Sequence, residues 1–133
     1  MLKARADRFE SLYQLSSYCL TVAREVLDRV KGVAIPDVGL LVKCLGQLEA
    51  IGLAFSKYDV TDFGSYNELK PLMVVISARN AIQSNLEGAI RKTEHQVIGK
   101  FLQRELEKII PALEEELAPL RKLADDARDL VRS

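Results

Sequence analysis

Few residues of this chain could carry out chemistry, and one short stretch holds its only histidine. His95 stands in the run EHQVIGK, with Gly99 four residues after it and Lys100 next to that glycine. An imidazole can accept and release a proton near neutral pH. On a helix, a residue four positions further on lies one turn away on the same face. Gly99 therefore lies one turn from His95, and Lys100 is a nearby cation.

This stretch partly resembles the H-x-x-K-G motif of histidine phosphotransfer domains, which are four-helix bundles of about this size. In that family the glycine clears space for the partner and the lysine steadies the phosphoryl group. Gly99 matches the glycine, but Ile98 stands where the lysine is expected, and the lysine follows as Lys100. The resemblance implies histidine phosphotransfer through His95. The competing interpretation is that His95 is a surface or capping residue in the first turn of a helix.

Other catalytic and metal-binding arrangements lack the residues they need. Cys19 and Cys44 form neither a metal-ligand spacing nor a CxxC motif. A di-iron bundle needs Glu-x-x-His, but Lys92 stands three residues before His95. The three glutamates at positions 114–116 are typical of a solvated helix face. We therefore expect a protein that is not an enzyme and that holds no metal and no cofactor.

Charge and composition indicate the kind of protein and partner. Lys plus Arg and Asp plus Glu each number 19, so the formal net charge is zero. Binding to a phosphate backbone needs a surplus of basic residues, so nucleic acid is not expected as the main partner. The start, MLKARADRFE, lacks the apolar stretch of a signal peptide, and we expect a cytoplasmic protein. Residues 1–133, with 48% hydrophobic residues, suit one domain with one core.

Helical periodicity runs through almost the whole chain, because apolar and small residues recur at steps of three and four. In the first segment they are Phe9, Leu12, Ser16, Cys19, Ala23, Val26 and Val30. In the second, from about Pro36 to Tyr58, they are Val38, Leu41, Leu45, Leu48, Gly52 and Phe55. In the third they are Leu72, Ile76, Ile82, Leu86 and Ile90, and in the fourth Leu106, Ile110, Leu113, Leu117, Leu120, Ala124, Ala127 and Val131. Gly32 is expected to end the first helix and Pro36 to open the second.

The start of the third helix is set by two conflicting signals. Ser65 with Glu68 matches a capping box, the side-chain pattern that begins a helix. Pro71 would lose a backbone hydrogen bond inside that helix. We therefore expect the third helix to start nearer Lys70.

The last part of the chain predicts a long helix. Thr93 with Gln96 makes a second capping-box pattern, and we place the turn before the last helix there. Pro111 and Pro119 lie inside the final repeat, so either they kink one helix or Pro111 begins a fifth; the unbroken register favours a kink. The expected fold is all-α, an antiparallel up-down-up-down four-helix bundle with a long, kinked C-terminal helix.

The second segment is unusual because it is apolar on every side. Its only polar residues between Val38 and Phe55 are Lys43, Gln47 and Glu49, and it contains the glycines Gly39, Gly46 and Gly52. Each glycine inside a helix costs about 1 kcal/mol relative to alanine, so some gain must offset three of them. A helix that is hydrophobic all round is normally buried on all sides, which three companion helices cannot achieve.

We therefore expect this segment to contact another molecule. The predicted interface consists of Gly39, Leu40, Lys43, Gly46, Gln47, Ala50, Ile51 and Ala54. Self-association into a small homo-oligomeric adaptor or regulator is the leading interpretation, and docking of another helical protein is the alternative. Association with a membrane is a further alternative, although Lys43 and Glu49 interrupt the apolar run and a stable span is not expected.

Overall fold

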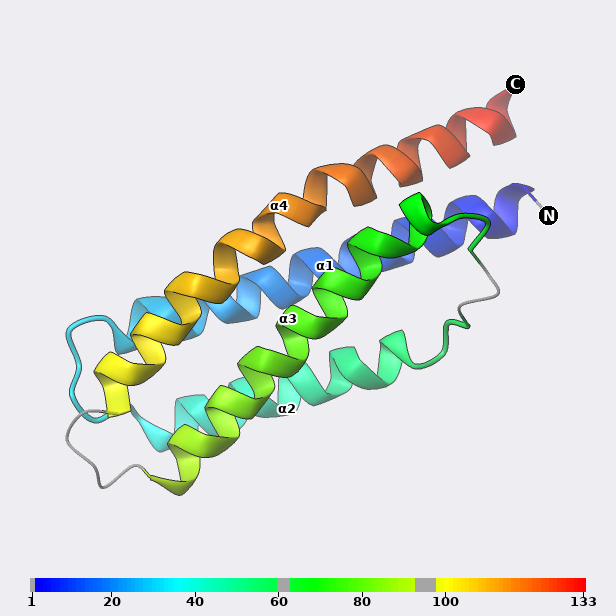
Figure 1. Cartoon of the computed structure of the whole chain (residues 1–133). Coiled ribbons are helices and arrows are strands. Elements are labelled where there is room, and N and C mark those ends of the chain that lie inside the picture. Colours follow the sequence, from blue (N-terminus) through cyan, green and yellow to red (C-terminus); the bar gives the residue numbers. More distant parts are fainter. Residues whose placement is uncertain (1, 60–62, 93–97) are drawn as a thin grey trace.

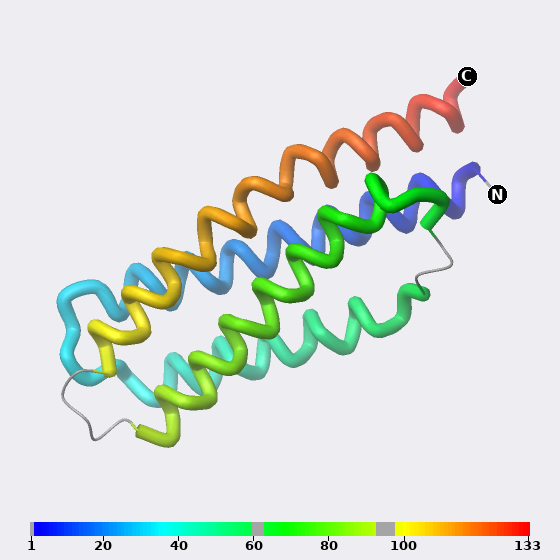
Figure 2. The backbone as a smooth tube through the Cα atoms, viewed as in Figure 1, coloured from blue at the N-terminus to red at the C-terminus, as the bar shows by residue number. Residues whose placement is uncertain are grey.

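The computed structural model of the chain describes residues 2–59, 63–92 and 98–133. It contains four α-helices: α1 (Leu2–Val30), α2 (Val38–Phe55), α3 (Tyr66–Arg91) and α4 (Ile98–Arg132). Consecutive helices run in opposite directions, so the start of α1 and the end of α4 lie at the same end of the molecule (Figures 1 and 2). The described residues contain no strand. The prediction of an all-α four-helix bundle is confirmed.

The core lies where the periodicity of α1 and α4 places it. These two helices share the most extensive contact in the bundle. Every residue of the predicted α1 stripe is buried. In α4 the stripe is buried from Leu106 to Ala127 except at Leu117, which is half-buried. Val131, in the last turn, is 42% exposed. α2 packs against α1 and α3 and lies diagonally across the bundle from α4.

Charged side chains align α1 with α4 near the end of the bundle that holds both termini. Arg121 and Arg128 both form ion pairs with Glu10. The Arg121 guanidinium also lies 4.5 Å from the centroid of the Tyr13 ring. The hydrogen bond from Arg121 lowers the pKa of Glu10 below its ordinary value. Because these side chains are partly exposed, they set the alignment of the two helices more than the stability of the fold.

Two residues were expected to shape the connection from α1 to α2. Gly32 ends α1 as expected, whereas Pro36 does not open α2. Gly32 has a φ of 70°, a left-handed conformation that glycine adopts without steric cost, and α1 ends before it. The prediction for Gly32 is confirmed. Asp37, not Pro36, caps the start of α2. Its side chain accepts a hydrogen bond from the Gly39 N–H at 3.0 Å. α2 also ends at Phe55, so the expected span from Pro36 to Tyr58 was too long.

The Ser65 half of the capping box at the start of α3 is confirmed, and the expected start near Lys70 is wrong. The Ser65 side chain accepts a hydrogen bond from the Glu68 N–H at 3.4 Å. Glu68 Oε2 accepts one from the Gly64 N–H at 2.8 Å. The first bond satisfies an N–H group that the first turn would otherwise leave unpaired, and the second satisfies the N–H of the residue before Ser65. They fix the start at Tyr66, and Pro71 is buried inside the helix.

The last connection lies partly outside the described residues. α3 ends at Arg91, and the proposed capping pair Thr93 and Gln96 falls in the segment 93–97, which the structure does not describe. α4 is one helix that contains both Pro111 and Pro119, so no fifth helix begins there. A kink at these prolines stays a prediction.

Candidate functional site

The inward face of α2 differs from the predicted one. Its buried residues are Leu41, Cys44, Leu48, Ile51 and Phe55. Val38, which begins the predicted stripe, is 40% exposed, and Ile51, which belongs to the predicted interface, is only 2% exposed. The helix is therefore rotated relative to the expectation. The physical reason is that α2 is apolar on both sides, so periodicity alone cannot select the side that enters the core.

The opposite side of α2 forms an exposed face, which we call the outer α2 face. It consists of Gly39, Val42, Lys43, Gly46, Glu49, Ala50 and Leu53, all exposed. At 100° per residue these positions fall within about 60° on either side of Gly46. Val42 is 52% exposed and Leu53 70% exposed. Two large aliphatic side chains thus face solvent on one helix.

Only some residues of the predicted interface lie together on the outer α2 face. Gly39, Lys43, Gly46 and Ala50 lie on the outer α2 face. Leu40, Gln47 and Ala54 are half-buried at its edges, and Ile51 belongs to the core instead.

Sequence reasoning missed Val42, Glu49 and Leu53. One signal could have found them: the only two charged residues of α2, Lys43 and Glu49, both lie on this face, and charged residues are almost never fully buried without a partner.

The three glycines of α2 have different environments. A Cβ on Gly52 would lie 2.9 Å from the guanidinium of Arg79, which donates a hydrogen bond to the Leu48 carbonyl at 2.8 Å. Gly52 therefore allows Arg79 to join α3 to α2. A Cβ on Gly39 would meet only the side chain of Asp37, at 3.3 Å. A Cβ on Gly46 would have no described atom within 4 Å. Only Gly46, at the centre of the outer α2 face, lacks a neighbour inside the bundle.

The contact between Gly52 and Arg79 can be tested by its effect on stability. Gly52→Ala is expected to lower the free energy of unfolding by up to about 1 kcal/mol, because Arg79 must leave its hydrogen bonds. In an Arg79→Ala background the same change is expected to raise it by about 0.5–1 kcal/mol, since only the helix preference of alanine remains. Urea unfolding of the four proteins measures this coupling. An identical effect of Gly52→Ala in both backgrounds would exclude the contact.

The surroundings of Gly99 give little support to the phosphotransfer interpretation. His95 itself lies outside the described residues. Gly99 is buried, and its N–H donates a hydrogen bond to the Ala34 carbonyl at 2.9 Å. A Cβ on Gly99 would lie 1.6 Å from the Val33 carbonyl oxygen. The space beside Gly99 is therefore filled by the chain's own α1–α2 connection, while Lys100 is exposed.

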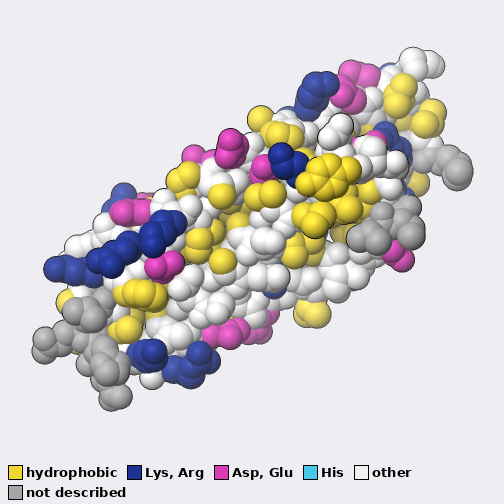
Figure 3. Space-filling view, in the orientation of Figure 1, with side chains coloured by type: hydrophobic (Ala, Val, Ile, Leu, Met, Phe, Trp, Pro, Cys, Tyr) yellow, Lys and Arg dark blue, Asp and Glu magenta, His cyan; other side chains and the backbone are white. Residues whose placement is uncertain are grey.

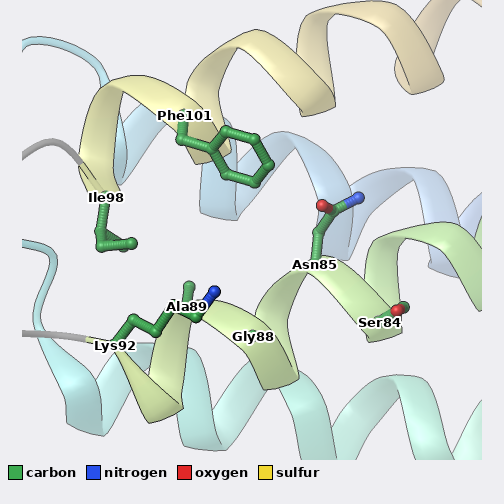
Figure 4. Close-up of a pocket in the computed structure, with 7 residues that line it drawn as sticks. All are labelled: Ser84, Asn85, Gly88, Ala89, Lys92, Ile98 and Phe101. Carbon is green, nitrogen blue, oxygen red and sulfur yellow. The ribbon is translucent and has the colours of Figure 1, made fainter.

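A pocket of about 380 Å³ lies between α3 and α4 (Figure 4). Ile98 and Phe101 project into it from α4, and Asn85 projects from α3 (Figure 4). The Asn85 side-chain N–H already donates to the Ala81 carbonyl at 2.9 Å. Lys92 is the one charged side chain among the described residues that line the pocket, and the other lining residues are neutral.

The two cysteines are buried thiols. Burial raises the pKa of Cys19 to about 11, although the nearby Arg79 opposes this shift. Burial also raises the pKa of Cys44 above its ordinary value, and the charge of Glu25 adds to that shift. Because the thiolate is the reactive form, neither side chain is an activated nucleophile near neutral pH. Over residues 2–59, 63–92 and 98–133, no three His, Cys, Asp or Glu residues are grouped so as to hold a metal ion.

Exposed apolar side chains also occur outside α2. Tyr66 is 67% exposed and Met73 51% exposed, both on α3. Figure 3 shows hydrophobic side chains gathered at the surface over the N-terminal half of α3 and along α4. By length and composition, α2 is the one helix of the described residues that is apolar enough to cross a membrane, and 28% of that helix is buried in the bundle.

Comparisons with known proteins found no match: no protein-family model, no curated protein and no solved structure matches this chain. Function must therefore be inferred from the residues and contacts of the chain itself.

Proposed function

We propose that this bundle is a non-enzymatic protein-interaction module, a small adaptor or regulator that associates with a second copy of itself through the outer α2 face. The observation that carries the proposal is the exposure of Val42 and Leu53, at 52% and 70%, on either side of Gly46. Full burial of a Val or Leu side chain contributes about 1.5–3 kcal/mol. A contact that covers both side chains on two copies therefore buries apolar area that favours association.

The glycine at the centre of this face supports the same conclusion. Glycine at an interior helix position costs about 1 kcal/mol relative to alanine. No described atom would touch a Cβ at Gly46, so packing within the bundle does not explain its presence. A second helix that crosses at this point would explain it, because the absence of a side chain lets two backbones approach closely.

The alternative occupant of the same face is a helix of a different protein. The exposed apolar side chains would suit it equally, since helix-in-groove recognition also uses residues at spacings of three, four and seven. Solution mass separates the two cases, because only self-association raises the molar mass of the purified chain.

The test is a matched pair of substitutions. Ala50→Glu places a charge on the outer α2 face and is expected to reduce the molar mass measured by light scattering to that of a monomer, with helicity unchanged. Ala112→Glu makes the same change at an exposed position of α4 and is expected to leave the mass of the wild type. A wild type that stays monomeric at all concentrations would contradict self-association. A monomer that co-sediments with lipid vesicles would favour the membrane interpretation instead.

A further inference from the structure

We propose that two copies pair about a two-fold axis that passes through Gly46, with Lys43 of each copy beside Glu49 of the partner subunit. This inference rests on the proposed self-association and specifies its geometry. It assigns to the two exposed charges of α2 the role of selecting one alignment of the two helices.

The exposed positions of the outer α2 face are arranged symmetrically about Gly46, and the two charges among them are opposite in sign. Lys43 lies three residues before Gly46 and Glu49 three residues after it. Three residues turn a helix by about 300°, so the two charges lie about 60° from Gly46 on opposite sides. Val42 and Ala50 lie four residues away, about 40° from Gly46, again on opposite sides. The face therefore carries opposite charges at equivalent positions, so an isologous contact can place each charge of one copy beside the opposite charge of the other.

The row Val42–Gly46–Ala50 sets the angle at which two such faces pack. Residues four positions apart form a ridge inclined to the helix axis, and two such ridges pack with the axes about 50° apart. Gly46 lies at the middle of this ridge and has no described neighbour within 4 Å of a Cβ. Two copies can thus approach most closely at Gly46, where the ridges of the two copies lie over each other, and each Val42 meets the same residue of the other copy.

This crossing brings unlike charges together. When the two-fold axis runs along the ridge, Lys43 of one copy lies on the same side of the contact as Glu49 of the partner subunit. The symmetry forms the equivalent pair on the other side. In an antiparallel alignment each Lys43 would instead share one side with Lys43 of the partner subunit. Opposite charges favour the crossed alignment, and like charges disfavour the antiparallel one.

Both charged groups are accessible for this pairing. Glu49 is exposed and forms no ion pair within the part of the chain that the structure describes. Lys43 Nζ lies 3.3 Å from Glu25 Oε1, and 60% of the Lys43 side chain remains exposed. The lysine can therefore contact a second carboxylate from outside the bundle.

The size of the contact predicts its strength. α2 has 18 residues and is about 27 Å long. A contact between single helices of this length lies at or below the smaller specific interfaces, which bury about 1,200 Å² in total. We therefore expect a reversible dimer that dissociates in the micromolar range.

The experiment is sedimentation velocity of two charge-reversed variants, alone and mixed. Lys43→Glu alone and Glu49→Lys alone each place like charges at both pairing positions, and each is expected to dimerise at least about tenfold more weakly than the wild type. An equimolar mixture of the two variants restores unlike charges at both positions. The mixture, and the double variant K43E/E49K, are expected to dimerise about as strongly as the wild type.

Two controls separate charge at this face from other effects. Arg104→Glu and Glu115→Lys make the same changes of net charge at exposed positions of α4, and both are expected to dimerise like the wild type. Because Lys43→Glu also places a carboxylate near Glu25, the comparison is repeated in a Glu25→Gln background, with helicity followed by circular dichroism.

The outcomes distinguish this geometry from the proposed function. If the wild type dimerises and both single variants dimerise equally well, the two-fold pairing at Gly46 is wrong while self-association stands. A mixture that remains monomeric, when each variant alone is monomeric, also overturns the reciprocal pairing. If the wild type is a monomer throughout, self-association itself fails.

Discussion

Gly99→Ala is expected to lower the free energy of unfolding by about 3 kcal/mol, near the upper end of the usual cost of overpacking. The new Cβ would lie 1.6 Å from the Val33 carbonyl oxygen and 2.8 Å from its carbonyl carbon. These are backbone atoms, so no change of rotamer relieves the overlap. Either the α1–α2 connection or the start of α4 must move, and the hydrogen bond from Gly99 to Ala34 is then lost. Urea unfolding followed by circular dichroism measures the change.

Gly88→Ala is the matched control for this prediction. Gly88 lies inside α3, and a Cβ there would have no described atom within 4 Å. Alanine is favoured over glycine in a helix interior, so this variant is expected to be more stable by about 0.5–1 kcal/mol. If Gly99→Ala instead matched the wild type or gained stability as Gly88→Ala does, the close approach at Gly99 would be refuted.

Phe9→Ala is expected to lower the free energy of unfolding by about 3–5 kcal/mol. The Phe9 side chain is fully buried, and its ring packs edge-to-face with that of Phe63, with the ring centroids 6.0 Å apart. The Arg5 guanidinium lies 4.9 Å from the centroid of the Phe9 ring and also pairs with Glu68 at the start of α3. Removal of the Phe9 ring therefore leaves a cavity beside Phe63 and the start of α3.

The control for Phe9 is the same substitution at an exposed aromatic residue. Phe101, on α4, is 49% exposed. Phe101→Ala removes much less buried area and is expected to cost about 1 kcal/mol or less. Thermal and urea unfolding of both variants measure the difference. Equal losses in the two variants would show that Phe9 does not have the central packing role described above.

The core of α1 and α4 could be predicted because each helix has one apolar side and one charged side. The polar side identifies the solvent direction, so the predicted stripes of α1 and α4 fall on buried residues except at Leu117 and Val131. α2 offers little such contrast. In the bundle Cys44 and Ile51 lie in the core and α2 packs against α1 and α3, but the spacing of apolar residues does not reveal this rotation. The charges of Lys43 and Glu49 were the only local indication.

The roles of the glycines were less predictable still, because the atoms that explain them lie far along the chain. Gly52 is explained by Arg79 of the next helix, and Gly99 by the connection that holds Val33. Both contacts exist only once the helices have packed. Gly99 was singled out from the sequence as the glycine of a phosphotransfer motif, whereas the structure gives it a packing role. Of the proposed interface, the sequence therefore indicated the exposed positions Gly39, Lys43, Gly46 and Ala50 but not the orientation of the whole face.

The most extensive contact in the bundle joins its first helix to its last. During synthesis on the ribosome, α1 emerges long before α4, so most of its apolar side stays uncovered until nearly the whole chain has been made. Helical proteins usually fold through contacts between neighbours in sequence, which makes them fast. This one must wait for its final segment, and a nascent chain that stalls after α3 would expose Leu12, Val26 and the rest of that stripe to aggregation and to chaperones.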